Sequence, residues 1–185
     1  NSGFMIDLPH ELSSADYLSS GDDLQAISLN RHAIEFAGQI AKRHEFPVEA
    51  FDRCGKINGA ATVKGDKHNQ SYAMHLKNIG EDFELYDAAK MQQITGSAYY
   101  SSGVYTPGTV MLQPALWARC LAETLTSQAG SRVEVHENSP VIDLRMVKQD
   151  WRLQTPTGSV VAPKVILATN GHVQSFGFFE RRLVH

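Results

Sequence analysis

Four small and polar residues, Ala168-Thr169-Asn170-Gly171, form the stretch of this chain best suited to contact a ligand. They follow the apolar residues 165–167, a pattern typical of a buried strand. In open α/β sheets, ligands bind beyond the carboxyl ends of the strands, where small residues let the backbone come close. An ordinary turn after a strand has the same composition, so the residues alone leave both interpretations open.

The sequence gives less support to a metal site or to a nucleophilic catalytic residue. The chain has 8 His and 2 Cys, but no pair of His has the i, i+4 spacing of a helical zinc site. Cys54 and Cys120 have no His neighbour in sequence, and no Gly-x-Ser-x-Gly elbow is present. We therefore predict no metal site, and we assign no catalytic residue.

Local patterns predict the elements that must position the 168–171 stretch. Hydrophobic periodicity and capping residues predict helices over residues 22–45, 66–79, 87–94 and 114–128, the last beginning at Pro114. Residues 1–20 show no period and are expected to be a loop. Strands are expected at 53–62, 98–105 and 133–136, the last parallel to 165–168. Three further strands are expected at 141–147, 151–155 and 159–161, where they should form an antiparallel meander.

The order of these motifs resembles the FAD-dependent oxidoreductases of the D-amino-acid oxidase superfamily. In that family a meander leads into a strand whose loop reaches the FAD, as the meander here leads into Ala168-Thr-Asn-Gly171. Asn1-Ser-Gly-Phe4 resembles the end of the loop beside the flavin, and residues 103–123 resemble the family's strand, "Gln-Pro" and helix. Asn1-Ser-Gly and Gln113-Pro114 are most similar to γ-glutamylputrescine oxidase-like members.

The resemblance implies specific contacts. Thr169 and the neighbouring backbone amides would lie near ribose or phosphate oxygens of FAD, and Gly171 would permit close approach. Val141 would contact the adenine through its backbone. The implied FAD contacts are Asn1, Ser2, Gly3, Val141, Ala168, Thr169, Asn170 and Gly171, and the implied substrate contacts are His10 and Tyr105. Each has a structural alternative as a strand, turn or packing residue.

The implied fold class is mixed α/β. It comprises part of an FAD/NAD(P)-binding sheet with an antiparallel β-meander, together with helices and strands of a substrate domain. Residues 1–15 and 110–175 would belong to the FAD-binding domain, and residues 16–109 and 176–185 to the substrate-binding domain.

The glycine-rich Gly-x-Gly-x-x-Gly loop, which holds the FAD pyrophosphate in this family, does not occur in these 185 residues. We therefore expect the chain to be an internal fragment of a larger enzyme. The fragment itself is expected not to retain FAD tightly, to be inactive, and to self-associate through exposed core surface.

Composition and charge limit the kinds of partner that the chain is expected to bind. A net charge of −3 and no basic cluster with interleaved aromatics predict no nucleic-acid binding. No apolar run reaches the length of a transmembrane segment, and the first residues of this sequence do not have the pattern of a signal peptide. With 42% hydrophobic and 20% charged residues, the chain has the composition of a folded globular protein. Two cysteines without paired spacing predict reduced thiols and a cytoplasmic location.

The expected function is oxidation of a C–N bond in an amine or amino acid, by hydride transfer to flavin. In such enzymes the cofactor carries the hard step, and the protein supplies orientation and electrostatics. Two alternatives stay open. One is a non-catalytic binding or interaction module without flavin, favoured by the missing glycine loop. The other, a flavin-dependent hydroxylase, would need an Arg-rich NADPH-contacting region and an Asp-Gly flavin loop, and this stretch contains neither.

Overall fold

The computed structural model describes residues 3–8, 21–127, 131–179 and 182. They fall into two compact units, Asn1–Arg132 and Val133–His185, which are described separately below. No helix in the described ranges is long and apolar enough to cross a membrane.

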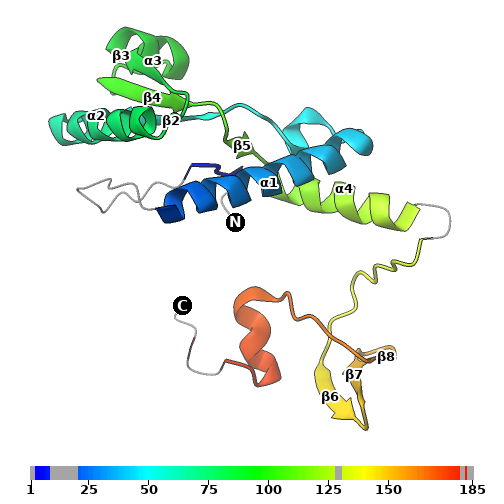
Figure 1. Cartoon of the computed structure of the whole chain (residues 1–185). Coiled ribbons are helices and arrows are strands. Elements are labelled where there is room, and N and C mark those ends of the chain that lie inside the picture. The colour runs from blue at the N-terminus through cyan, green and yellow to red at the C-terminus, as the bar shows by residue number, and fades with distance from the viewer. Residues whose placement is uncertain (1–2, 9–20, 128–130, 180–181, 183–185) are drawn as a thin grey trace. The chain divides into compact units, whose positions relative to one another are not determined.

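The first unit contains a three-stranded antiparallel sheet in the order β2-β4-β3 (Figure 1). Its strands are β2 (Lys56–Ala60), β4 (Ser102–Thr106) and β3 (Glu84–Asp87). The register pairs Asn58 with Val104, and Leu85 with Val104 on the other side. Because side chains alternate across a strand, Val104 faces the core and Gly103 faces the opposite side of the sheet.

Helix α2 (Val63–Asn78) covers one face of this sheet. It begins where the Thr62 side chain accepts a hydrogen bond from the Gly65 amide, as an N-cap residue does. Its buried side includes Tyr72 and Leu76, which lie four residues apart on one face of the helix and pack with Leu8, Ile27 and Val104 in the core. Helix α3 (Ala88–Thr95) covers the opposite face, where Met91 packs over Gly103.

Helix α1 (Gly21–Arg43) confirms the predicted first helix. Hydrophobic periodicity places five residues on one stripe of this helix, and four of them are buried: Ile27, Ile34, Ala37 and Ala41. The fifth, Leu24, lies in the first turns of α1 and is 55% exposed.

A short two-stranded ribbon pairs residues near the start of the first unit with residues much later in its sequence. Strand β1 (Phe4–Met5) pairs antiparallel with β5 (Val110–Met111). Helix α4 (Pro114–Ser127) follows and begins at the predicted proline, with the Gln113 side chain accepting from the Leu116 amide. The Trp117 ring contacts Phe46 and Phe51, which flank the 3₁₀ helix η1 (Val48–Ala50).

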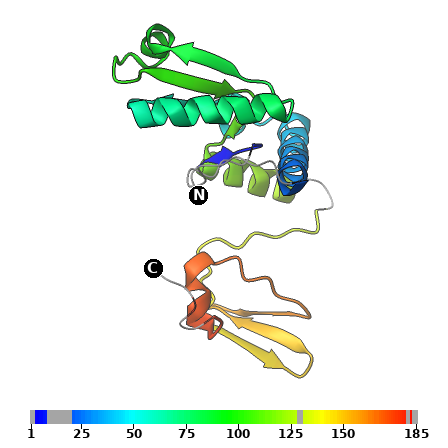
Figure 2. The same cartoon turned by 60° about the vertical axis from the view of Figure 1, so that its left-hand side comes forward.

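The second unit is built on the predicted meander, which the structure confirms (Figure 2). Strand β7 (Asp150–Gln154) pairs antiparallel with β6 (Asp143–Val147) on one side and β8 (Ser159–Ala162) on the other. A 3₁₀ helix, η2 (Asn170–Phe176), lies further along the chain.

The mixed α/β fold class is confirmed, but several element predictions differ. Residues 133–136 form no strand, and neither do residues 165–168, so the predicted parallel pair is absent from the described residues. Strand β1 lies within the region expected to be a loop, and β3 was not anticipated. These differences share a cause, because a strand depends on its hydrogen-bonding partners more than on its own sequence.

Candidate functional site

The segment before Thr169 departs from the expected buried strand. From residue 165 to residue 168 its side chains alternate between half-buried and exposed, and Ile166 is 91% exposed. Within the described part of the chain no strand pairs with it. Without a ladder on either edge the segment stays extended but irregular, because its backbone groups have no partner strand to bond.

One face of this segment does pack. Val165 and Leu167 line an apolar cavity of about 300 Å³ together with residues of the meander and the following helix, namely Leu144, Trp151, Val173, Phe178 and Phe179. Val141, the predicted adenine contact, is half-buried just before β6. Its neighbour Ile142 continues the ladder by donating its amide to the Gln154 carbonyl at 2.8 Å.

Thr169 has the most unusual environment of the predicted FAD contacts. It precedes η2 at the N-cap position, yet its side chain makes no capping hydrogen bond. Its hydroxyl oxygen is buried and has no hydrogen-bond partner among the residues that the structure describes. A buried hydroxyl left unpaired costs about 1–3 kcal/mol, so this group is suited to a partner that the chain does not supply.

Asn170, and not Gly171, takes the left-handed conformation in this turn, with φ of 51°. Asn tolerates this region better than most residues because its short polar side chain bonds locally. The close approach expected at Gly171 therefore has no support from its backbone conformation.

The predicted flavin loop is described only at Gly3, because Asn1 and Ser2 lie outside the described residues. Gly3 has φ of +76°, and a Cβ there would lie 2.7 Å from the Leu112 carbonyl oxygen. Its own carbonyl accepts the Leu112 amide at 2.6 Å. The positive φ and the lack of room for a Cβ require glycine here for packing against the strand β5 region, independently of any ligand.

Sequence patterns gave no sign of the charged network that follows this loop. Asp7 is 1% exposed, and its Oδ2 atom lies 3.1 Å from Nη2 of Arg31 in α1. Arg31 also donates to both carboxylate oxygens of Glu81, and this hydrogen bonding raises the pKa of the guanidinium despite partial burial. The Asp7 charge also acts on Lys56, but burial outweighs it and lowers the pKa of the Lys56 ammonium.

Of the two predicted substrate residues, the structure describes only one. His10 lies outside the described residues. Tyr105 is half-buried on the face of the sheet opposite α2, where its ring stacks on Tyr86 with centroids 5.9 Å apart. Its hydroxyl donates to the Cys54 carbonyl at 3.4 Å. These contacts suit packing, and the substrate role of Tyr105 stays a prediction.

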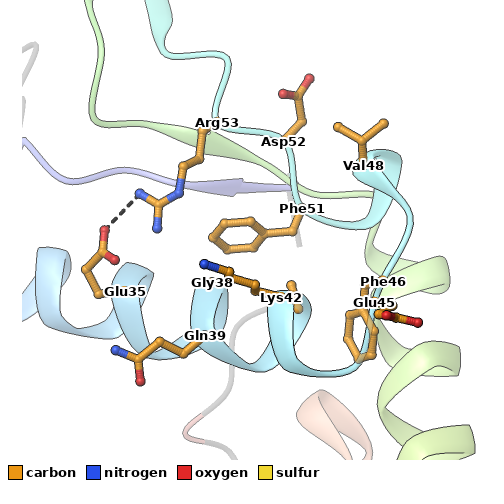
Figure 3. Close-up of a pocket in the computed structure, with 11 residues that line it drawn as sticks. Glu35, Gly38, Gln39, Lys42, Glu45, Phe46, Val48, Phe51, Asp52 and Arg53 are labelled. Atoms are coloured by element: carbon orange, nitrogen blue, oxygen red, sulfur yellow. Dashed lines mark ion pairs between the residues drawn. The ribbon is translucent and has the colours of Figure 1, made fainter.

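A separate cavity of about 670 Å³ lies between the second half of α1 and residues 45–53 (Figure 3). Arg53 crosses it, paired with Glu35 at 2.8 Å and lying 5.4 Å from the centre of the Phe51 ring. Gly38 lies directly beneath, since a Cβ there would be 2.7 Å from the Arg53 guanidinium. Arg53 and Glu35 thus satisfy each other across the cavity, and we assign it no ligand.

The family model for FAD-dependent oxidoreductases matches residues 2–184. The chain belongs to this family. A curated relative, the probable oxidoreductase OrdL of Haemophilus influenzae, is 30% identical over 98 residues, which are 52% of this chain and 22% of that protein.

Solved structures show the same fold at low identity. Glycine oxidase from Geobacillus kaustophilus superposes with a TM-score of 0.65 at 19% identity, over 90% of this chain and 43% of that one. L-proline dehydrogenase from P. horikoshii gives 0.58 at 12% identity, over 82% and 40% of the two chains. The chain thus spans less than half the length of these family members.

Family membership gives the Thr169 environment a chemical context. FAD carries phosphate and ribose oxygens that could accept a hydrogen bond from an unpaired hydroxyl. The buried, unpartnered Thr169 oxygen is thus compatible with FAD binding in the family, whereas Gly3 is explained by packing alone. Among the residues that the structure describes, no group of three His, Cys, Asp or Glu side chains could hold a metal ion.

Proposed function

We propose that this chain is part of an FAD-dependent enzyme that oxidises the C–N bond of a small amine or amino acid. Membership of the FAD-dependent oxidoreductase family supports the cofactor and the reaction type. When bound, FAD supplies the acceptor for the hydride that leaves the carbon next to nitrogen. The similar structures include a glycine oxidase and an L-proline dehydrogenase, which favours a small amino-acid or amine substrate.

The observation that supports a cofactor contact here is the buried hydroxyl of Thr169, which has no hydrogen-bond partner among the described residues. We propose that it donates to a ribose or phosphate oxygen of FAD, with Ala168, Asn170 and Gly171 beside it. Val141 would contact the adenine through its backbone, and Asn1, Ser2 and Gly3 would lie at the flavin. The chain's part in the reaction is then to bind and orient the cofactor, with Tyr105 and His10 as proposed substrate contacts.

The assignment of residue ranges to an FAD-binding and a substrate-binding domain is also a proposal. We assign residues 1–15 and 110–175 to the FAD-binding domain and residues 16–109 and 176–185 to the substrate-binding domain. The two compact units, Asn1–Arg132 and Val133–His185, divide the chain at a different place, and this grouping by contact does not test the functional assignment. Asn1-Ser-Gly and Gln113-Pro114 favour a γ-glutamylputrescine oxidase-like enzyme.

We further propose that the 185-residue chain alone holds FAD weakly and is inactive, since it has no Gly-x-Gly-x-x-Gly loop. Cys54 and Cys120 are both free thiols, which favours the reducing cytoplasm as its location. The first test is to sequence the reading frame upstream of Asn1. A glycine-rich loop between a strand and a helix would support the flavoenzyme, and a start codon directly before Asn1 without that loop would favour the non-catalytic module.

The second test measures the Thr169 contact in the full-length protein. Thr169→Val removes the hydroxyl while keeping the side-chain shape, and Thr157→Val makes the same change at an exposed turn residue. Loss of one hydrogen bond of about 1 kcal/mol predicts that Thr169→Val raises the Kd for FAD about fivefold. FAD affinity is measured by titrating the apoprotein with FAD. Equal affinity in the two variants would show that the Thr169 hydroxyl does not contact FAD.

A further inference from the structure

Three charged side chains from separate segments meet in the first unit. The Arg31 guanidinium donates through Nε and Nη2 to Oδ2 of Asp7, at 3.4 Å and 3.1 Å. Its Nη1 donates to Oε1 of Glu81 at 3.0 Å, and Nη2 also bonds the second Glu81 oxygen. A guanidinium can bridge two carboxylates in this way because its N–H groups are fixed in a planar fork.

Asp7 is also held on its other sides. Its backbone carbonyl accepts a hydrogen bond from the Asn30 side chain at 3.3 Å. Gly108 lies so close that a Cβ there would be 1.9 Å from Oδ2 of Asp7. The next residue, Leu8, is buried in the hydrophobic core. The carboxylate is therefore confined to one position between α1 and the turn that contains Gly108.

This confined residue lies four positions after Gly3. Between them, Phe4 and Met5 pair with β5, and the Gly3 carbonyl accepts the Leu112 amide. The short segment that begins at Gly3 is thus held at two points: by the β1–β5 ribbon at residues 3–5, and by the Asp7–Arg31–Glu81 network at its far end. An extended segment this short has little freedom once both ends are fixed.

We propose that Arg31 is a positioning residue for the flavin loop, and that its bridge between Asp7 and Glu81 sets the position of Gly3 relative to the flavin. The inference rests on the proposed function, because it requires that Gly3 lie at FAD. The Arg31 side chain is 46% exposed, so solvent screens its ion pairs and they contribute little net stability. The main consequence of the network is then the geometry that it imposes on the segments it joins.

The test compares two arginine variants in the full-length, FAD-containing protein. Arg31→Met breaks the network, and the matched control Arg53→Met breaks the ion pair of another arginine with an α1 glutamate, Glu35. The measurements are the rate of FAD release and the visible absorption spectrum of the bound flavin at full occupancy. We expect Arg31→Met to release FAD about tenfold faster, equivalent to about 1.4 kcal/mol, and to shift the flavin bands. Arg53→Met should leave both unchanged.

Arg31→Lys separates positioning from simple charge balance. Lysine restores the positive charge beside Asp7, but its compact ammonium lacks the fork that bridges both carboxylates. We expect Arg31→Lys to release FAD nearly as fast as Arg31→Met. Full rescue by lysine would overturn the positioning role, because charge alone would then be sufficient.

Other outcomes are equally decisive. A lower Tm for Arg31→Met, with wild-type release rate and flavin spectrum, would show a structural role only and overturn the inference. If Arg31→Met does not fold, Glu81→Gln tests the same bridge while keeping the Arg31–Asp7 pair, and unchanged FAD release would again overturn it. A wild-type protein that binds no FAD would instead refute the proposed function, so the two failures are distinguishable.

Discussion

Gly108 illustrates how one residue constrains the region after the flavin loop. A methyl group there would meet the Asp7 carboxylate, which cannot retreat because Arg31 holds it. We expect Gly108→Ala to destabilise the first unit by about 1–3 kcal/mol, the usual cost of overpacking. Urea unfolding followed by Trp117 fluorescence measures this change.

Gly158→Ala is the matched control, since a Cβ at Gly158 would have nothing within 4 Å. Its effect, followed by Trp151 fluorescence, should be within about 0.5 kcal/mol. Wild-type stability in Gly108→Ala would mean that Asp7 has more room than the structure shows.

Asp66 provides a pH-dependent contact at the start of α2. Hydrogen bonds from the Ser102 and Ser101 hydroxyls hold the pKa of its carboxyl below the ordinary value of 3.8. A lowered folded-state pKa stabilises the fold above the unfolded pKa, and this contribution is lost as the pH falls through the folded pKa. Ser102→Ala should therefore raise the Asp66 pKa towards 3.8 and weaken the acid dependence of stability.

An NMR titration of the Asp66 carboxyl carbon measures the change. Ser139→Ala is the control, because the Ser139 hydroxyl donates to the Glu137 carbonyl in the other unit. An Asp66 titration that is the same in both variants would show that Ser101 and the surroundings, rather than Ser102, lower its pKa.

At the scale of elements, residues 165–168 form an extended segment without a partner strand in the described residues, with Ile166 91% exposed. Unpaired extended backbone beside exposed apolar side chains favours association between chains. We expect the 185-residue chain to form dimers or larger species, and Ile166→Lys to shift it towards monomer. Sedimentation velocity over a range of concentrations measures the distribution.

Thr157→Lys adds the same charge at an exposed position in the β7–β8 turn and controls for general repulsion. It should leave association nearly unchanged. If both lysines reduce association equally, net charge and not the apolar segment governs it.

At the scale of the whole molecule, the two units differ in how much core they contain. The first has a cluster that includes Leu8, Tyr72 and Leu76, whereas no described residue of the second is fully buried. Small units with little buried surface are marginally stable. We therefore expect the second unit to unfold at a lower urea concentration than the first.

The chain offers a direct measurement, because each unit contains one tryptophan: Trp117 in the first and Trp151 in the second. In Trp151→Phe, fluorescence reports the first unit, and in Trp117→Phe it reports the second. Coincident transitions in both variants, with circular dichroism confirming the same midpoint, would show that the chain unfolds as one cooperative system.

The four α-helices could be predicted from sequence because the signals that define them are local. Pro114 marks the start of α4, Asp87 caps α3, and the stripe from Ile27 to Ala41 gives the buried side of α1. The meander was likewise predicted, since each strand pairs with its neighbour in sequence across a short turn. Family resemblance also followed from the order of motifs, and the family match confirms it.

Only the tertiary structure decided which residues meet across long stretches of sequence. Arg31 lies outside the apolar stripe of α1, yet it joins Asp7 and Glu81, which no local pattern relates to it. Residues 165–168 have the composition of a buried strand, but the described chain supplies no strand beside them. Helix signals lie within a few residues, whereas ion networks and strand pairing depend on partners that folding brings from elsewhere.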